Sequence, residues 1–440
     1  MLDECPTVTI QSLVDQQILD RPIDGNHGAI HPKTSDFVGT GIPFIMASDL
    51  KNGEVDFTGC AFITLQQAQG LRKGFAKTGD VLISHKGTVG RTALIGPLTS
   101  EYIVLTPQVT YYRVRDTSKL CRHFLKYYFD SPDFQELFDN WSNSGSTRAY
   151  LGITEQARLP VAFPPIQVQR EIVDILKPID DKIDHNRKLN LSLETMARTL
   201  FQSWFVDFDP GVAKAEGRQP FGAPSEVAAM FPAEFTESTI GPIPREWEPG
   251  SVESLGQYVN GRNFTGGASG SGRMVIRIAE LNSRPGPSTI YNSISSKPEN
   301  TAYPDDILFA WSGSLDVYRW HRDEGLVNQH IFKVVCQKYP KWFVYHHLVV
   351  AMPFFQGIAA DKATTMGHIK REHLQEATIT LPPISLVESA SRIFTPMFDR
   401  IHANERQILS LTALRDALLP ELLLGNLRLA DAEHRVEHAL

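Results

Sequence analysis

Residues 163–166 read Phe-Pro-Pro-Ile and residues 381–384 read Leu-Pro-Pro-Ile, which places Pro164 and Pro382 218 residues apart. The same offset aligns further identical residues without a gap as far as Leu200 and Leu418: Pro178 with Pro396, Asp181 with Asp399, Ile183 with Ile401, Asn186 with Asn404, Ser192 with Ser410, and Leu193 with Leu411. A repeat of this length is one structural unit used twice. We therefore expect a chain that recognises two similar objects, or one object in two places.

Each copy of the repeat predicts a long helix. Apolar residues alternate at three- and four-residue spacing, which is typical of a coiled-coil seam, and an asparagine enters the seam at the same repeat position in both copies. We expect antiparallel pairing that brings Asn186 and Asn404 near one another; the alternative is that each helix packs on its own domain. The residues expected to pair the helices are Ile179, Ile183, Asn186, Leu193, Leu200, Met397, Ile401, Asn404, Leu411 and Leu418.

A proline lies inside each predicted helix, at Pro178 and Pro396. Proline removes a backbone donor and kinks or restarts a helix. We therefore expect a short leading helix, a bend, and then a helix of about 25–28 residues, roughly 40 Å long at 1.5 Å per residue.

The segments that precede the two repeats share a plan. Residues 79–84 and 305–310 each read as a turn that enters a strand, and Gln108 has a counterpart in Gln329. Aromatic residues at helical spacing follow in both segments, at 121–138 and 342–357. A common frame with different loops is expected of two recognition modules with different targets, and equally of drift after a duplication.

The expected fold class is α+β: two similar α/β recognition domains separated by a pair of long antiparallel coiled-coil helices, with a pseudo-twofold internal repeat. The expected domain boundaries are 1–160 for the first recognition domain, 161–208 for the central helical region, 209–245 for a proline-rich linker, 246–380 for the second recognition domain, 381–428 for the C-terminal helical region, and 429–440 for a tail.

Composition limits the class of protein. The 440 residues carry a net charge of −7 and are 42% hydrophobic and 21% charged, which is ordinary for a globular protein of two or three domains. Four cysteines lie far apart without a CxxC pair, so the sequence favours a reducing cytoplasm over a disulfide framework or a zinc site. No apolar run suggests a membrane span, and the start has no signal-peptide pattern.

The sequence motifs of self-sufficient catalysis are missing. There is no phosphate-binding loop, no dinucleotide fingerprint, no Asn-Pro-Pro-aromatic motif of base methylation, and no HExxH metal pattern. His346 and His347 are adjacent, so in a helix they point apart and are expected to be structural. Asp305 and Asp306 could form a nuclease pair, but acidic turn residues before a strand are common. We predict no catalytic residue, no metal ligand and no cofactor site.

Three stretches of the helical repeat and its flanks point to a family: 163–176 (FPPIQVQREIVDIL), 179–187 (IDDKIDHNR) and 200–210 (LFQSWFVDFDP). Together with linker residues 213–218, 231–235 and 241–247, and tail residues 417–429, they resemble the specificity subunit of type I restriction-modification systems over essentially the whole chain. One departure is Ser385-Leu386-Val387-Glu388 in the second copy, where that family usually has an acidic-Gln pair that Val168-Gln169 half preserves in the first copy. This departure bears on whether both helices dock a partner equally well.

This resemblance implies a function. Each of two target-recognition domains would read one half of a split target in double-stranded DNA, and the paired helices would set the spacer. The helices would also carry methyltransferase subunits, two in number, and a motor-nuclease subunit would complete the restricting complex. S-adenosylmethionine, ATP and Mg²⁺ would then bind to partner subunits, and this chain would be non-catalytic by itself.

Residues suited to DNA contact lie in polar turns with an excess of basic residues over acidic ones. Arg and Lys suit guanine and phosphate, and Asn suits adenine. The candidates are Lys86, Arg91, Asn143 and Arg148 in the first domain, and Arg262, Asn263, Arg273, Trp311, Arg319, His368 and Lys370 in the second. For each of them the alternative is an ordinary solvated side chain. Trp320 is expected in the core rather than on a base.

Two other functions remain open from the residues alone. A self-contained restriction-modification enzyme is disfavoured because its cofactor and nuclease motifs are missing. A scaffold that holds two proteins apart without DNA is mildly supported by the acidic total, because phosphate binding needs a positive surface.

Overall fold

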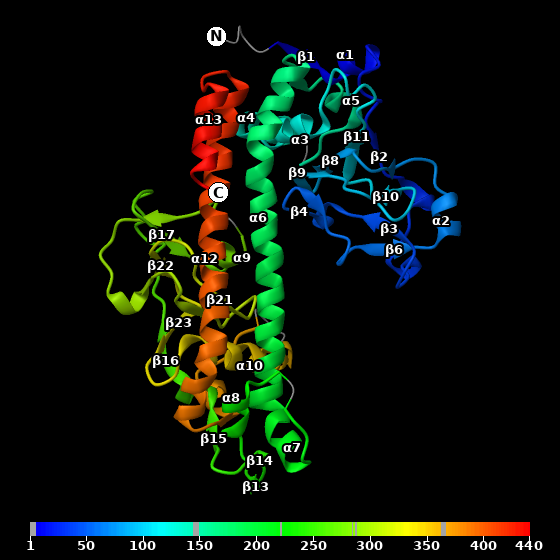
Figure 1. Ribbon diagram of the computed structural model, residues 1–440. Helices are drawn as coiled ribbons and strands as arrows, with labels where there is room; N and C mark the ends of the chain where they lie inside the picture. The colour runs from blue at the N-terminus through cyan, green and yellow to red at the C-terminus, as the bar shows by residue number, and fades with distance from the viewer. Residues whose placement is uncertain (1–5, 144–148, 221, 284, 287, 362–366) are drawn as a thin grey trace. The chain divides into compact units, whose positions relative to one another are not determined.

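The computed structural model describes residues 6–143, 149–220, 222–283, 285–286, 288–361 and 367–440. The chain divides into two compact units, residues 1–183 with 410–440 and residues 184–409. Each unit contains one α/β module together with a segment of each long helix (Figure 1).

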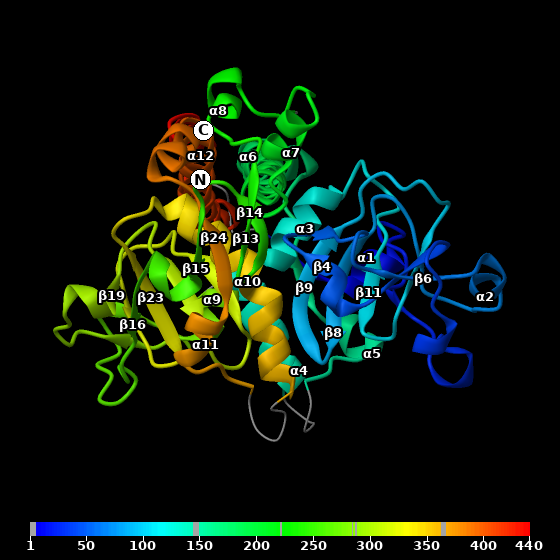
Figure 2. The same cartoon turned by 90° about the horizontal axis from the view of Figure 1, so that it is seen from below.

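The first module is built on two four-stranded sheets, with strand orders β6-β3-β10-β7 and β2-β11-β8-β9. Its helices α3 and α4 lie next to β9 (Figure 2). The elements are β1 (Thr7–Thr9), α1 (Ile10–Asp15), β2 (Ile23–Asp24), η1 (Gly28–Ile30), η2 (Thr34–Asp36), β3 (Ile42–Ile45), η3 (Ala47–Asp49), β4 (Leu50–Lys51), β5 (Glu54–Val55), β6 (Ala61–Ile63), α2 (Leu65–Gln69), β7 (Phe75–Ala76), β8 (Val81–Lys86), β9 (Thr88–Leu94), β10 (Ile103–Leu105), β11 (Val109–Tyr112), α3 (Arg122–Asp130), α4 (Pro132–Asn143), α5 (Ile153–Gln156) and β12 (Pro160–Ala162).

The second module repeats this plan with sheets β16-β23-β20-β21 and β18-β17-β22-β19. In each module one of the two sheets holds one parallel pair: β3 with β10 in β6-β3-β10-β7, and β17 with β22 in β18-β17-β22-β19. The elements are β15 (Glu248–Ser251), η5 (Val252–Leu255), β16 (Gly256–Asn260), β17 (Arg273–Ile276), α9 (Ile278–Asn282), β18 (Tyr291–Asn292), η6 (Pro298–Asn300), β19 (Thr301–Ala302), β20 (Ile307–Ala310), β21 (Asp316–Arg319), β22 (Gly325–Val327), β23 (Ile331–Cys336), α10 (Lys341–Asp361), α11 (Glu372–Glu376) and β24 (Thr378–Leu381).

In each module the first strand pairs with the last strand. In the first, β1 pairs antiparallel with β12, with Thr9 opposite Pro160. In the second, β15 pairs antiparallel with β24, with Glu248 opposite Leu381. The chain therefore enters and leaves each module at one place, directly before the long helix begins.

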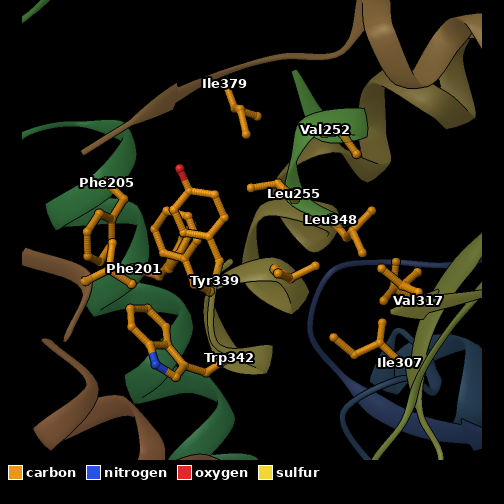
Figure 3. Packing of buried hydrophobic residues seen from close by; sticks show 14 of the residues in the cluster. Phe201, Phe205, Val252, Leu255, Ile307, Val317, Tyr339, Trp342, Leu348 and Ile379 are labelled. Carbon is orange, nitrogen blue, oxygen red and sulfur yellow. The ribbon is translucent and has the colours of Figure 1, made fainter. Parts of the chain in front are cut away.

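The core of the second module packs aromatic side chains against the end of the first long helix and against the second long helix. Trp342 stacks on Phe394 at 4.3 Å between ring centroids, and Phe205 lies edge-on to Phe343 at 5.4 Å. Figure 3 shows Phe201 and Phe205 on this helix facing Tyr339 and Trp342. Burial of such large apolar side chains is the dominant stabilising term for a module of this size.

Helix α10 corrects one expectation from the sequence. Residues 341–360 have a mean hydropathy of 1.3, so by length and composition this helix could cross a membrane, whereas the sequence suggested no such run. Its residues Phe343, Val344, Leu348 and Phe355 are completely buried in the module core, which explains the apolar composition.

The long helices are continuous through their prolines, which corrects the expected short leading helix. Helix α6 (Ile166–Phe201) has 36 residues and α12 (Ile384–Leu423) has 40. At 1.5 Å per residue these lengths are about 54 and 60 Å. Proline costs one hydrogen bond, but Leu176 and Ile179 on either side of Pro178 are fully buried, and this packing holds the helix together. A π-helical segment, η4 (Gln202–Val206), continues α6.

In the second unit α6 and α12 run side by side and antiparallel (Figures 1 and 2). Asn186 donates to Gln407 at 2.9 Å and Asn190 donates to Glu405 at 2.7 Å, so numbers rise along one helix as they fall along the other. Asn404 donates to Asn190 rather than to Asn186, which lies one helical turn away. The expected proximity of Asn186 and Asn404 is therefore confirmed, although they do not bond directly. The ten predicted pairing residues are buried or half-buried.

Gln169 connects α6 to the first module through side-chain hydrogen bonds. Its side chain is fully buried, accepts from the backbone N–H of Cys121 at 2.8 Å, and donates to the carbonyls of Lys119 and Pro164. Val387, at the same repeat position, is fully buried in the apolar core of the second module. The two copies thus differ at this position in how each helix is joined to its own module.

The linker is ordered and belongs to the second unit. It consists of α7 (Asp209–Ala215), α8 (Ser225–Ala229) and the hairpin of β13 (Phe235–Ser238) with β14 (Gly241–Pro244). Phe231 packs its ring 6.0 Å from both Trp204 and Trp247. In the first unit, the segment expected as a tail contains a helix, α13 (Leu429–Glu437), which buries Ala432 and Val436.

Candidate nucleic-acid interface

A hairpin tip in the first module is held by a neighbouring segment of the chain. The backbone N–H of Gly87 donates to the carbonyl of Ala149 at 3.1 Å, and the N–H of Leu151 donates to the carbonyl of His85 at 3.0 Å. Lys86 and Tyr150 form an isolated β-bridge between these two bonds. The tip of the β8–β9 hairpin is thereby joined to the segment that follows α4.

The second module builds the same tip from different residues. Gly313 donates to the carbonyl of Gly367 at 3.0 Å, and Ile369 donates to the carbonyl of Trp311 at 3.0 Å. Ser312 and His368 form the bridge between them. Gly87 and Gly313 both have a left-handed backbone, with φ of +80° and +72°, a conformation that favours glycine. His85, Lys86 and Tyr150 therefore correspond to Trp311, Ser312 and His368.

The first tip presents a cation beside an aromatic face. Lys86 is exposed, and its Nζ lies 5.8 Å from the ring centroid of Tyr150, which is 45% exposed. Below them His85 is fully buried, and its Nδ1 lies 2.9 Å from the carbonyl of Leu151. Burial lowers the pKa of His85, so the ring is neutral at neutral pH. The ammonium suits a phosphate, and the ring suits a sugar or base edge.

The second tip has an aromatic residue, Trp311, and its basic residue is Lys370, two positions after His368. Trp311 donates from Nε1 to Asn260 at 3.0 Å, and its half-buried ring lies 5.1 Å from that of His330. His368, which pairs with Ser312 in the β-bridge, is exposed. Lys370 is also exposed and pairs with Glu372 at 3.0 Å. Such a side-chain set can contact a groove edge through an indole, an imidazole and an ammonium.

The remaining candidates of the first module lie close to its hairpin and α4. Arg91 is exposed on β9, with Nη1 3.3 Å from the carbonyl of Ala47. Asn143 is exposed at the end of α4 and donates to the Asp139 side chain at 2.9 Å. Arg148 lies outside the residues that the structure describes.

The glycine-rich loop of the second module begins at two exposed candidates, Arg262 and Asn263. Asn263 Oδ1 accepts from the N–H and the hydroxyl of Thr265, an Asx turn that shapes the loop. Arg273 is differently placed: its guanidinium donates to the carbonyl of Ile294 at 2.6 Å and approaches Glu324 at 3.4 Å. These internal contacts occupy much of the donor capacity of Arg273.

Arg319 is far from an open surface. Its side chain is 4% exposed, and Nη2 donates to Asp305 at 2.6 Å and to the carbonyl of Phe398 at 2.9 Å. We leave Arg319 out of the proposed interface for this reason. Trp320 is 3% exposed in the core, as expected, and donates to the carbonyl of Asp323.

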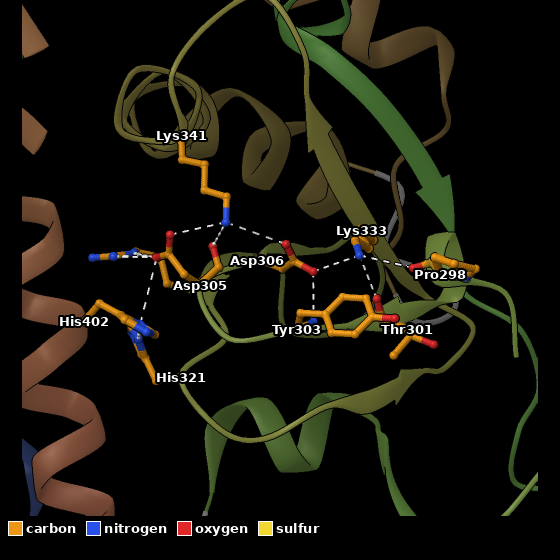
Figure 4. Close-up of polar contacts among 10 residues, drawn as sticks. Pro298, Thr301, Tyr303, Asp305, Asp306, His321, Lys333, Lys341 and His402 are labelled. Carbon is orange, nitrogen blue, oxygen red and sulfur yellow. Dashed lines mark hydrogen bonds and ion pairs between the residues drawn. The ribbon is translucent and has the colours of Figure 1, made fainter.

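Asp305 and Asp306 are neutralised by cations of the same module (Figure 4). Lys341 reaches Asp305 at 3.2 Å, and Lys333 reaches Asp306 at 2.8 Å. Burial acts to raise the pKa of Asp305, but the hydrogen bonds and charges of Arg319 and Lys341 together outweigh it and leave that pKa below its usual value. The pair is thus a structural ion network. Among the residues that the structure describes, no group of three metal-ligating side chains is found.

Sequence reasoning missed Tyr150, Asn260 and His330. The 218-residue offset already pairs Tyr150 with His368, so the repeat held a signal for Tyr150 that residue chemistry alone did not give. Asn260 and His330 contribute through contacts with Trp311 across three strands, and no sequence pattern marks such contacts.

Comparisons with known proteins agree on one family. The family model described as the type I restriction modification DNA specificity domain matches residues 26–195. A type I restriction enzyme specificity subunit of Methanocaldococcus jannaschii is 24% identical over 91% of this chain and 90% of that protein. One of Haemophilus influenzae is 27% identical over 50% of this chain, and this match spans only 56% of that subunit's length. The fold resembles the crystal structure of a type I restriction-modification S subunit from M. genitalium, with a TM-score of 0.51, 12% identity and 95% coverage of both chains.

Proposed function

We propose, from the premise that this chain belongs to the family of type I restriction-modification specificity subunits, that it recognises a bipartite sequence in double-stranded DNA. Each module would read one half of the target. The observation that carries this proposal is the duplicated hairpin tip, which places Lys86 with Tyr150, and Trp311 with His368, at equivalent points of two equivalent modules.

The two tips differ in a way that suits two different half-sites. The first offers an ammonium and a phenol, whereas the second offers an indole and an imidazole. A common backbone frame with different side chains would dock on DNA in the same way and read different bases. Of the predicted contacts, Lys86, Arg91, Asn143, Arg262, Asn263, Arg273, Trp311, His368 and Lys370 are exposed or half-buried and stay in the proposal.

The long helices would set the distance between the half-sites. Their polar seam fixes one antiparallel register through Asn186, Asn190 and Asn404. We further propose that the helices dock two methyltransferase subunits and that a motor-nuclease subunit completes the complex. S-adenosylmethionine, ATP and Mg²⁺ would serve those subunits, and the assembly would act in the cytoplasm.

The two rival functions predict different behaviour of the purified protein. A self-contained enzyme would methylate or cut DNA without partners, and the cation-neutralised Asp305 and Asp306 give it no carboxylate pair. A scaffold without DNA would leave the exposed Lys86 and the half-buried Trp311 without a role.

The test is methylation by this chain assembled with the methyltransferase subunits of the same system. Modified-base sequencing of DNA treated with the complex should reveal one split motif with a fixed spacer. The chain alone should modify nothing. Modification without a defined motif, or none by the complete complex, would contradict the proposal.

A further inference from the structure

Besides the aromatic packing of Trp342 on Phe394, three contacts between the second module and α12 form a regular row. Arg319, at the end of β21, reaches Phe398; His321 reaches His402; and Asp323 reaches Arg406. We call these three pairs the contact row. Its module side advances by two residues at each step, and its helix side advances by four.

The helix partners lie on one face of α12, because four residues of helix span about 6.0 Å and return nearly to the same face. The module partners run from the end of β21 into a bend at Arg322 and Asp323, and all three pairs form together in one register. A shift of the module along α12 by one residue would turn every helix partner by about 100° and break all three pairs.

The first pair is the most buried. The Arg319 guanidinium carbon lies 3.2 Å from the centroid of the Phe398 ring, and Nη2 donates to the Phe398 carbonyl. Asp305 holds the same guanidinium from the module side. Arginine suits such a site because its planar group can stack and donate in a fork at once, whereas lysine cannot.

The second pair joins two imidazoles. His321 Nδ1 and His402 Nδ1 lie 2.9 Å apart, so one nitrogen must donate and the other must accept (Figure 4). Burial lowers the pKa of His321 to about 3 and also lowers that of His402, which leaves both rings neutral at neutral pH and permits this bond. Asp305 Oδ1 lies 4.0 Å from the same nitrogen of His402.

The third pair lies at the surface. Arg406 is 43% exposed and donates to Asp323 at 2.8 Å and to the carbonyl of His321 at 3.3 Å. Because the Arg406 side chain is outside the core, it can be changed with little effect on folding.

We propose that the contact row is a second determinant of spacer length, because it fixes, together with the aromatic packing on Phe394, where the second module sits along α12. Arg319, His321 and Arg406 are then positioning residues. They select the distance between the half-sites without touching a base. A shift by four helical residues, about 6 Å, corresponds to nearly two base pairs at 3.4 Å each. The proposal rests on the function proposed above.

The experiment measures methylation by the assembled complex on DNA with the native spacer and with spacers one and two base pairs shorter or longer. Arg319→Lys keeps the charge beside Asp305 but loses the stacked fork. Arg406→Gln removes the outer contact. The matched control is Arg392→Gln on the same helix, where the exposed guanidinium lies 3.4 Å from Glu226 of α8.

We expect Arg406→Gln to raise methylation of the shifted spacers, relative to the native spacer, by about two- to fivefold, as for loss of a surface ion pair. Arg319→Lys should have a larger effect, and the bases recognised in each half-site should not change. Arg392→Gln should behave as the wild type does. A purely structural role would lower methylation of all spacers together.

The proposal is overturned if Arg406→Gln gives the wild-type spacer profile in a complex with wild-type thermal stability. That outcome would count even if Arg319→Lys failed to assemble. If the wild-type complex methylates no bipartite motif, the proposed function fails and this inference fails with it. If the wild-type complex methylates its bipartite motif normally and Arg406→Gln leaves the spacer profile unchanged, only the proposal about the contact row fails.

Discussion

Asn404 donates a 2.7 Å hydrogen bond to Asn190 across the helix seam, and both side chains are at most 4% exposed. At the offset of 218 residues Asn404 aligns with Asn186, whereas Asn190 aligns with Ile408. The polar layer is thus formed by two successive seam positions of α6 and a single one of α12. Such an arrangement specifies one register because a shifted helix would leave a buried amide without a partner.

Replacement of Asn404 by Leu should lower the free energy of unfolding by about 1–3 kcal/mol, because the buried Asn190 side chain would lose one of its partners. The double variant Asn190→Leu, Asn404→Leu should recover part of this loss, since two apolar side chains can face each other across the seam. Urea unfolding of the single and double variants measures both effects. A double variant that loses the sum of the two single effects would show that the pair does not act as a unit.

A four-residue insertion after Asn190 should lengthen the spacer of the recognised site. Four helical residues add about 6 Å, close to two base pairs at 3.4 Å each. The insertion keeps the helical phase approximately, because 3.6 residues make one turn. Mapping of methylated sites provides the measurement. An unchanged spacer in an active complex would show that the helices do not set the distance.

Lys86→Ala should weaken DNA binding by the complex and reduce its dependence on salt. One phosphate contact contributes about 0.9 to the slope of log K against log salt concentration. The matched control is Lys77→Ala, because Lys77 pairs with Glu101 at 3.2 Å and precedes β8 at the end opposite to the hairpin tip. Titration of labelled DNA at several salt concentrations gives both slopes. Equal slopes for wild type and Lys86→Ala would remove Lys86 from the interface.

Mild acid should destabilise the second module. Burial lowers the pKa of His347 to about 3, against 6.5 for a free histidine. The unfolded chain therefore binds the proton first, and stability is lost as pH falls from about 6.5 toward 3. Each such histidine contributes up to about 1.4 kcal/mol per pH unit in this window.

His347→Leu should reduce this pH dependence by about that amount, because Leu occupies the core without a titratable group. Thermal unfolding at pH 5 and pH 7 gives the comparison. His185→Leu on α6 serves as a control at a histidine that is not buried. A slope that is unchanged by His347→Leu would show that His347 is accessible to protons in the folded chain.

The sequence was sufficient to predict the helices and their pairing, because the offset of 218 residues and the apolar spacing are properties of the chain itself. It was also sufficient to predict the shared plan of the modules. It misjudged Pro178, since the packing of Leu176 and Ile179 that maintains the helix depends on tertiary structure. Arg319 looked like a free surface cation, and its stacking on Phe398, 79 residues away, has no local signal.

The most direct test of two reading modules is to change one tip at a time and map the methylated motif. Lys86→Ala with Tyr150→Ala should relax the bases recognised in one half of the motif, and Trp311→Ala with His368→Ala should relax those in the other half, with the spacer unchanged in both. If both pairs of substitutions altered the same half, or altered neither while the complex remained active, the account of one module for each half-site would be wrong.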